Sequence, residues 1–232
     1  MKRTIIACLV LLGTACVQNA NLSMVEIDGR AYPSDFTKCT FATGGQFWLG
    51  PGTLDLSYPG SSYRMVLYVK NNLADPTTLD PAALTGAKVW YPQAADVRID
   101  PKSYTDAYGP NPALLSTTFS GNVTGLDGQG IQPAGGSGTV LVVAVSAPLA
   151  MQLGALVGPM DVKSLVLGVT LRGKTGDGSS LDSAEWYFPL QVCNGCLPLP
   201  TCTTAGQVPV DQSCFGPQQD ALELCGTPPS PQ

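Results

Sequence analysis

Two thiols lie three residues apart in Cys193-Asn194-Gly195-Cys196, a spacing that suits a redox pair or a zinc pair. A redox pair normally begins a helix, whose dipole lowers the thiol pKa. Leu197-Pro198-Leu199-Pro200 follows here, and it is not a typical helix start. Zinc would need four ligands, which cysteines alone could supply. The choice between zinc and a disulfide therefore depends on the compartment in which the protein works.

Six cysteines lie beyond residue 16, enough for three disulfides whose connectivity cannot be read from the sequence. Five of the six lie in the last forty residues and cannot all pair with one another. We therefore expect the remaining one, Cys39, to pair with one of these five, with Cys193 or Cys196 favoured, and so to join the start of the domain to its end. The six candidates for disulfide bonds are Cys39, Cys193, Cys196, Cys202, Cys214 and Cys225.

The N-terminus has the features of an export signal. Lys2 and Arg3 are followed by the short apolar run Ile5–Leu12 and then by Gly13-Thr14-Ala15-Cys16. The run is too short for a permanent membrane helix, which needs ~20 apolar residues, and it suits the apolar region of a secretory signal. The last four residues resemble the lipobox of bacterial lipoproteins, although Gly13 stands where that family usually has an aliphatic residue.

The lipoprotein resemblance covers only the first sixteen residues and implies a cellular location rather than an activity. It implies cleavage before Cys16 and attachment of palmitate-type acyl chains to that residue, which would anchor the protein to a membrane. Val17 is not the Asp that in this family often signals retention in the inner membrane, so the resemblance implies the outer membrane. The alternative is a plain signal peptide cut after Ala15. In either case the protein is exported, which favours disulfides over zinc at the cysteines, and we expect no metal or cofactor.

Composition excludes several classes of function. Removing residues 1–15 takes away two basic residues and no acid, which leaves 10 Lys and Arg against 17 Asp and Glu, a net charge of −7. An acidic chain of this kind has no basic surface for nucleic acid. The chain has no histidine, so the commonest general base is missing. We therefore expect a protein that is not an enzyme.

Gly and Pro punctuate short β-branched runs, a pattern typical of many short strands joined by turns. We expect an all-β antiparallel β-sandwich of immunoglobulin-like architecture, with a short helix over 148–156. The predicted organisation is a signal peptide (1–15), a lipid-anchored tether (16–24), the sandwich (25–192) and a disulfide-rich C-terminal extension packed on it (193–232). Candidate strands are Tyr63–Val69, Ala87–Tyr91, Val97–Ile99, Leu115–Phe119, Thr139–Ser146, Val162–Arg172 and Ala184–Val192.

Three further patterns have a structural interpretation that we favour. The segment 168–175 matches the phosphate-binding pattern GxxxxGK[ST], but its residues form strands and a turn follows instead of a helix. The uncharged run Val140–Met160 is long enough to cross a membrane, but a buried strand followed by a short helix explains its Pro and Gly residues better. Asp177, Asp182 and Glu185 could suggest calcium, but their spacing does not match an EF-hand loop, and a solvated turn fits better.

The first hypothesis is a non-enzymatic binding or structural module of the cell envelope, whose partner is an envelope protein or a polysaccharide. The second is a carbohydrate-binding module, whose exposed aromatic side chains stack on sugars. Its candidate residues are Trp48, Trp90, Tyr91 and Trp186, together with Tyr104 and Tyr108 in a long loop over 101–112. The third is a hydrolase with two carboxyl groups about 5 to 9.5 Å apart across a cleft.

Overall fold

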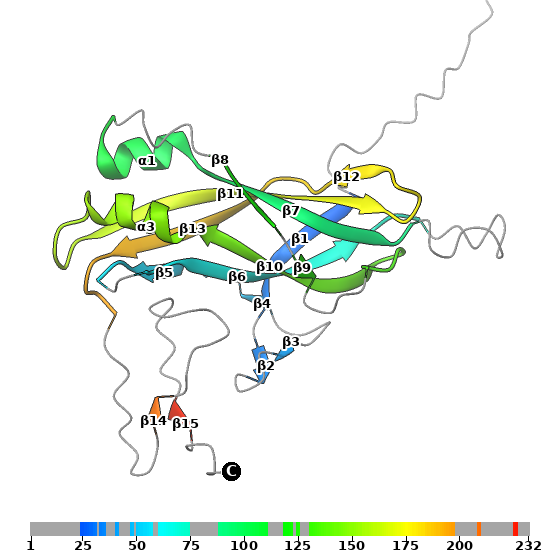
Figure 1. Ribbon diagram of the computed structural model, residues 1–232, viewed down its shortest axis with the longest axis horizontal. Coiled ribbons are helices and arrows are strands. Elements are labelled where there is room, and N and C mark those ends of the chain that lie inside the picture. The colour runs from blue at the N-terminus through cyan, green and yellow to red at the C-terminus, as the bar shows by residue number, and fades with distance from the viewer. Residues whose placement is uncertain are drawn as a thin grey trace, which may run out of the picture.

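The computed structural model describes residues 24–31, 33–35, 40–41, 47–48, 50–57, 60–74, 88–110, 118–122, 124–125, 130–197, 208–209 and 225–226. Two sheets form the body of the protein, and one of them curls into a half-barrel (Figure 1). The first has the order β4-β1-β6-β10-β9, from β1 (Val25–Ala31), β4 (Phe47–Trp48), β6 (Tyr63–Asn71), β9 (Thr124–Gly125) and β10 (Gly136–Val145). The second has the order β5-β13-β11-β7-β8, from β5 (Gly52–Asp55), β7 (Trp90–Ile99), β8 (Thr118–Asn122), β11 (Val162–Thr175) and β13 (Trp186–Cys193), with β12 (Ser180–Asp182) beside β11.

Two small pairs complete the strands: β2 (Pro33–Asp35) with β3 (Thr40–Phe41), and β14 (Val208–Pro209) with β15 (Cys225–Gly226). The predicted β-rich class is confirmed, but the sheets are not purely antiparallel. β5 runs parallel to β13, with Leu190 opposite Gly52 and Cys193 opposite Asp55. Sequence pattern misses this pairing because the two strands are more than 130 residues apart in the chain.

β6 shows how sequence alternation builds the core. Tyr63, Met65, Leu67 and Val69 belong to the main hydrophobic core between the sheets, as their spacing predicts. Val66 and Tyr68 point to the other face, where they form a small second cluster with Ala31. The apolar sequence of β10 would suit a strand that is buried on both faces. Only one face is covered at its centre: Val140 and Val142 lie in the core, whereas Val143 is exposed.

Pro92 does not end a strand, so the prediction of two strands at 87–91 and 97–99 is wrong. A single strand, β7, runs from Trp90 to Ile99. Its register against β11 shifts between Arg172 and Gly173, which lie opposite Ala94 and Pro92. The pairing skips Gln93, next to the proline, and this bulge lets β7 continue past a residue that has no N–H to donate.

The loop predicted over 101–112 is instead largely a helix, α1 (Pro101–Tyr108). Asp100 caps it by accepting a hydrogen bond from the Ser103 amide at 2.8 Å, and Pro101 occupies the first turn, where it needs no hydrogen-bonding N–H. Tyr104 is fully buried and stacks on Tyr108, with ring centroids 5.1 Å apart. The pair packs into the core, and burial raises the pKa of both phenols.

The second helix, α3 (Ala147–Gly154), confirms the helix predicted near 148–156. It follows β10 directly, so the apolar run 140–160 is a strand and a short helix, as expected. Among the described residues, no helix is both long enough and apolar enough to span the bilayer.

The phosphate-loop pattern at 168–175 lies within β11, and the chain then turns into β12. Phosphate binding by such a loop requires a helix N-terminus after the strand. A hairpin stands there instead, so the strand-and-hairpin interpretation is confirmed.

Candidate functional site

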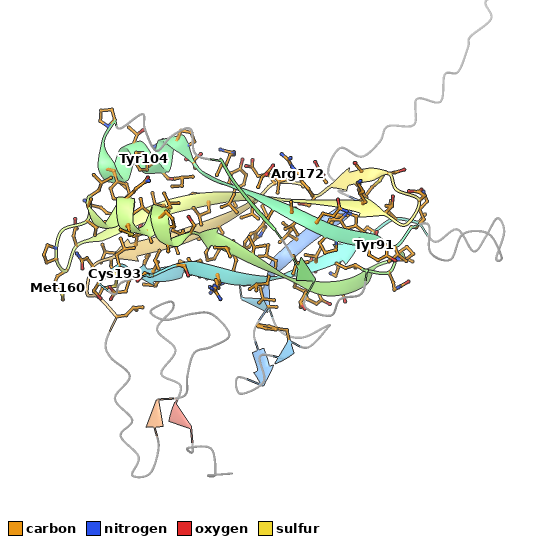
Figure 2. All side chains as sticks on the ribbon, viewed as in Figure 1. Tyr91, Tyr104, Met160, Arg172 and Cys193 are labelled. Carbon is orange, nitrogen blue, oxygen red and sulfur yellow. A yellow bond between two sulfur atoms is a disulfide. The ribbon has the colours of Figure 1, made fainter. Side chains whose placement is uncertain are left out.

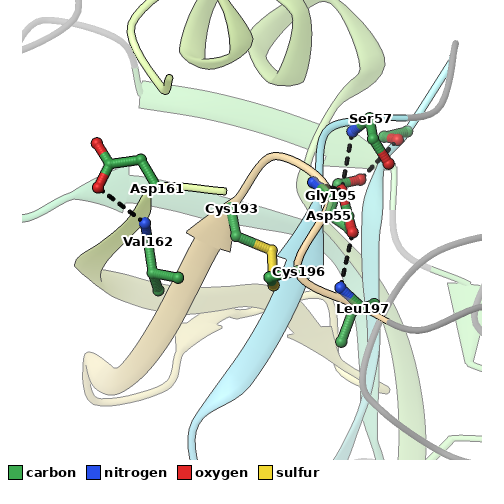
Figure 3. The surroundings of a disulfide bond; sticks show 9 residues. Asp55, Ser57, Asp161, Val162, Cys193, Gly195, Cys196 and Leu197 are labelled. Carbon is green, nitrogen blue, oxygen red and sulfur yellow. Dashed lines mark hydrogen bonds between the residues drawn. A yellow bond between two sulfur atoms is a disulfide. The ribbon is translucent and has the colours of Figure 1, made fainter. Parts of the chain in front are cut away.

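The parallel pairing of β5 with β13 brings Asp55 and Cys193 to the same end of the sheet. Both strands end there, and the Leu56 amide donates to the Cys193 carbonyl at 2.7 Å. The chain after Cys193 then turns back over the Asp55 side chain (Figure 3). This arrangement places the segment 194–197 against a carboxylate that is completely buried.

Backbone amides surround the Asp55 carboxylate. Its Oδ1 accepts hydrogen bonds from the Gly195 amide at 2.8 Å and the Ser57 amide at 2.9 Å, and its Oδ2 accepts one from the Leu197 amide at 2.9 Å. Burial by itself raises the pKa of this carboxyl group, but the amides favour the ionised form and outweigh burial, so the pKa is lowered. Asp55 is therefore a buried anion that holds together β5, the following turn and the loop after β13.

A disulfide between Cys193 and Cys196 closes this loop, with the two Cα atoms 5.8 Å apart. Gly195 sits inside it at a φ of +88°, a conformation that glycine adopts at little cost. The expectation that Cys39 pairs with Cys193 or Cys196 is corrected, because these two cysteines pair with each other. The other predicted disulfide residues, namely Cys39, Cys202, Cys214 and the side chain of Cys225, lie outside the described part, as does Cys16.

The same corner contains the closest approach to a metal site among the described residues. One ligand atom from each of Asp55, Cys193 and Cys196 lies within 4.8 Å of the others. The sulfurs are joined in a disulfide, however, and thiolates are the form that binds zinc. The described residues 194–197 contain no helix, whereas a redox pair normally begins one. The corner is best explained as a structural clasp.

A pocket of about 350 Å³ opens beside this clasp. Its lining comes from the turn after β5, from α3 and from the clasp itself: Leu56, Ser57, Gly60, Ser61, Ala150, Met151, Gly154 and Asn194. Met151 is 73% exposed at the rim, and none of the lining residues is charged. A pocket of this kind suits a small neutral group, and its lining offers no pair of carboxylates for hydrolysis.

A second polar cluster lies on the outer face of the larger sheet. The Arg98 guanidinium binds both oxygens of Glu185, with Nη2 2.8 Å from Oε2, and it also donates to the Tyr187 hydroxyl at 3.1 Å. The Tyr187 hydroxyl in turn donates to Glu185 Oε2 at 2.7 Å. Gly168 makes room for this cluster, because a Cβ there would lie 2.3 Å from Glu185 Oε1.

Hydrogen bonds fix the protonation states of the two acidic groups in this cluster. The hydrogen bond to Glu185 raises the pKa of Tyr187, so the phenol keeps its proton. The hydrogen bond from Arg98 lowers the pKa of Glu185, so that group stays ionised. At neutral pH the cluster therefore consists of a protonated phenol and a carboxylate whose two oxygens are both bound by Arg98.

The aromatic residues predicted to bind sugar do not form one exposed surface. Trp90 and Tyr104 are fully buried and Tyr108 is largely covered, while Trp186 is half-buried against Phe188. Tyr91 is exposed on the face opposite to Trp90, as their adjacent positions on a strand predict. The side chain of Trp48 lies outside the described part. The exposed residue that our sequence analysis missed is Tyr187, although its place in the run Ala184–Val192 two positions from Glu185 was a usable signal.

The three acids considered for calcium do not converge. Asp177 caps the hairpin between β11 and β12 by accepting from the Thr175 hydroxyl and the Ser179 amide, and these bonds lower its pKa to about 2. Asp182 lies opposite Arg172 in β11, and Glu185 binds Arg98. The predicted solvated turn is confirmed for Asp177.

Comparison with protein-family models, with curated proteins and with solved structures finds no match to this chain.

Proposed function

We propose that the protein is a cell-envelope lipoprotein, a non-enzymatic binding module that is held on the outer membrane through lipidated Cys16. Its sandwich is of immunoglobulin-like type in this proposal. The lipobox-like signal directs the protein to the membrane, and the domain provides the surface that binds a partner.

The observation that carries the proposal is the arrangement of the two ends of the sandwich. Met24 and Val25 lie at one end, where the Met24 carbonyl accepts from the Asn72 amide at 2.8 Å and Val25 lies opposite Asn71. The pocket and the Cys193–Cys196 clasp lie at the other end, beside Val162. The fourteen residues of β11 run between these ends, a distance of about 40 Å at ~3.3 Å per residue. Figure 2 labels Tyr91 near the first end, and Met160 and Cys193 at the second.

This arrangement suits a protein tethered by its N-terminus. A chain anchored at Cys16 reaches the first strand after a tether of only nine residues, 16–24. The near end of the sandwich would then face the membrane, and the far end would project away from it. The disulfide supports export as well, because such bonds persist in oxidising compartments.

Cell fractionation of a Cys16→Ala variant tests the proposal. We expect the unaltered protein in the membrane fraction and the variant in the soluble fraction, because the variant has no site for lipid. Cys8→Ala is the matched control: it changes a cysteine inside the signal, which cleavage removes, and should leave the protein on the membrane. Membrane association of Cys16→Ala equal to that of the unaltered protein would refute the anchor.

A further inference from the structure

We propose that the outer face of the β5-β13-β11-β7-β8 sheet binds a neutral polysaccharide along β11, between Tyr187 and Tyr91. The inference rests on the binding role proposed above and adds the class of ligand and the surface that recognises it. It keeps Tyr91 from the set that the sequence predicted and adds Tyr187, because Trp90 and Tyr104 of that set are buried.

Two tyrosine rings are exposed on this one face. Tyr187 is 54% exposed and lies opposite Gly168, and Tyr91 is 44% exposed and lies opposite Lys174. Gly168 and Lys174 are an even number of residues apart on β11, so both rings are on the same side of the sheet. The six-residue separation places them about 20 Å apart along the strand at ~3.3 Å per residue. Two rings at this spacing suit an extended chain of several sugar units better than a single small molecule.

Tyr187 is fixed before any ligand arrives. Its hydroxyl is bonded to both Glu185 and Arg98, and the Arg98 guanidinium carbon lies 5.8 Å from the ring centroid. Gly168 allows these side chains to lie close against the sheet. A ring that is already held in place loses little conformational entropy on binding, which favours its use as a stacking surface.

The charges on this face favour a neutral ligand. Three basic and three acidic side chains of the described residues lie on it, so their charges cancel. Arg98 pairs with Glu185, and Arg172 pairs with Asp96, each cation beside its anion. Lys174 and Asp182 are exposed on neighbouring strands. An acidic or basic polymer finds no net attraction here, whereas fixed guanidinium and carboxylate groups can exchange hydrogen bonds with hydroxyl groups.

A polysaccharide also fits this surface better than a protein partner does. The core of a protein interface is depleted in charged residues and built from aromatic and other apolar side chains. Here the surroundings of Tyr187 are Gly168 and the Arg98–Glu185 pair. A sugar ring offers both an apolar face for stacking on tyrosine and hydroxyl groups for the paired charges.

Affinity electrophoresis of the full chain in native gels tests the inference. Separate gels contain dextran, laminarin, galactomannan or hydroxyethyl cellulose, with the anionic polymer alginate as the charged comparison. We expect at least one neutral polymer to retard the protein, and we expect Tyr187→Ala and Tyr91→Ala each to weaken that retardation by about tenfold in apparent Kd. Val143→Ala, which truncates an exposed side chain of β10 on the other sheet, is the matched control and should bind like the unaltered protein.

Several results would overturn the inference: no retardation by any of the four neutral polymers, stronger retardation by alginate, or unchanged binding in either tyrosine variant. A thermal unfolding curve for each variant shows whether a loss of binding comes from a loss of folding. Tyr187→Phe is the second variant, because it keeps the ring and should retain most of the binding. These outcomes are independent of membrane attachment, which the Cys16→Ala experiment measures separately.

Discussion

Asp55 shows how one side chain can organise a whole corner of the molecule. Three backbone amides from two different segments converge on its carboxylate, which is fully buried. A buried charge is costly unless hydrogen bonds replace its hydration. The amides of Gly195 and Leu197 supply this replacement, and the Cys193–Cys196 disulfide keeps them in position.

We predict that Asp55→Asn lowers the free energy of unfolding at pH 7 by about 2 kcal/mol. The substitution replaces one carboxylate oxygen, which accepts hydrogen bonds from backbone amides, with an amide N–H₂ that cannot accept them. The pKa of Asp55 is lowered in the folded protein, so its ionised form contributes stability above the unfolded-state value of 3.8. That contribution is lost as pH falls through the folded-state pKa. Urea unfolding of both proteins between pH 7 and pH 2 measures the difference.

The difference in free energy of unfolding between the unaltered protein and Asp55→Asn should therefore be largest above pH 5 and should become smaller in acid. Asp182→Asn, at an exposed position in β12, is the control and should follow the unaltered protein throughout. A constant gap across the whole range would mean that the charge of Asp55 is not what stabilises the corner.

At the scale of elements, local pattern predicts some strands well and fails where long-range packing decides. The alternation in β6 correctly assigns Tyr63, Met65, Leu67 and Val69 to one face, because period two follows from strand geometry. Proline misleads at β7, where a bulge absorbs Pro92. It misleads again at α1, where Asp100 followed by Pro101 is a helix start rather than a loop.

The candidate site was less predictable than the fold class. The motif Cys193–Cys196 is visible in the sequence, and the expectation of a disulfide rather than zinc agrees with the structure, but the favoured partner, Cys39, was wrong. Its partner Asp55 is not visible, because only the parallel pairing of β5 with β13 brings the two together. The Arg98–Glu185–Tyr187 cluster depends in the same way on the register of three strands.

The docking of β5 can be tested through Gly52. A Cβ at this position would lie 2.0 Å from the Tyr63 hydroxyl oxygen and 2.7 Å from Phe188 Cζ, both in the core. We predict that Gly52→Ala lowers the free energy of unfolding by about 3 kcal/mol, because overpacked cores must shift side chains or backbone. Gly158→Ala is the matched control, since its nearest contact would be 3.9 Å away. Equal stability of the two variants in urea unfolding would show that β5 is not packed as described.

At the scale of the whole molecule, the proposed function places membrane attachment and partner binding at different parts of the two-sheet body. The end at Val25 would receive the proposed tether, and the other end carries the Asp55 clasp and the uncharged pocket. The outer face of the larger sheet extends between them along β11. A module anchored at Cys16 could therefore attach to the membrane at one end and offer its sheet face and far end to partners in the envelope.

Intact mass spectrometry of the protein from the membrane fraction, before and after reduction, tests the lipoprotein proposal most directly. The account predicts a chain that begins at Cys16 and carries acyl chains, and that gains two hydrogens on reduction for each of three disulfides. A peptide map should locate one of these between Cys193 and Cys196. An unlipidated mass with free thiols would contradict both the anchor and the oxidising compartment on which the proposed function depends.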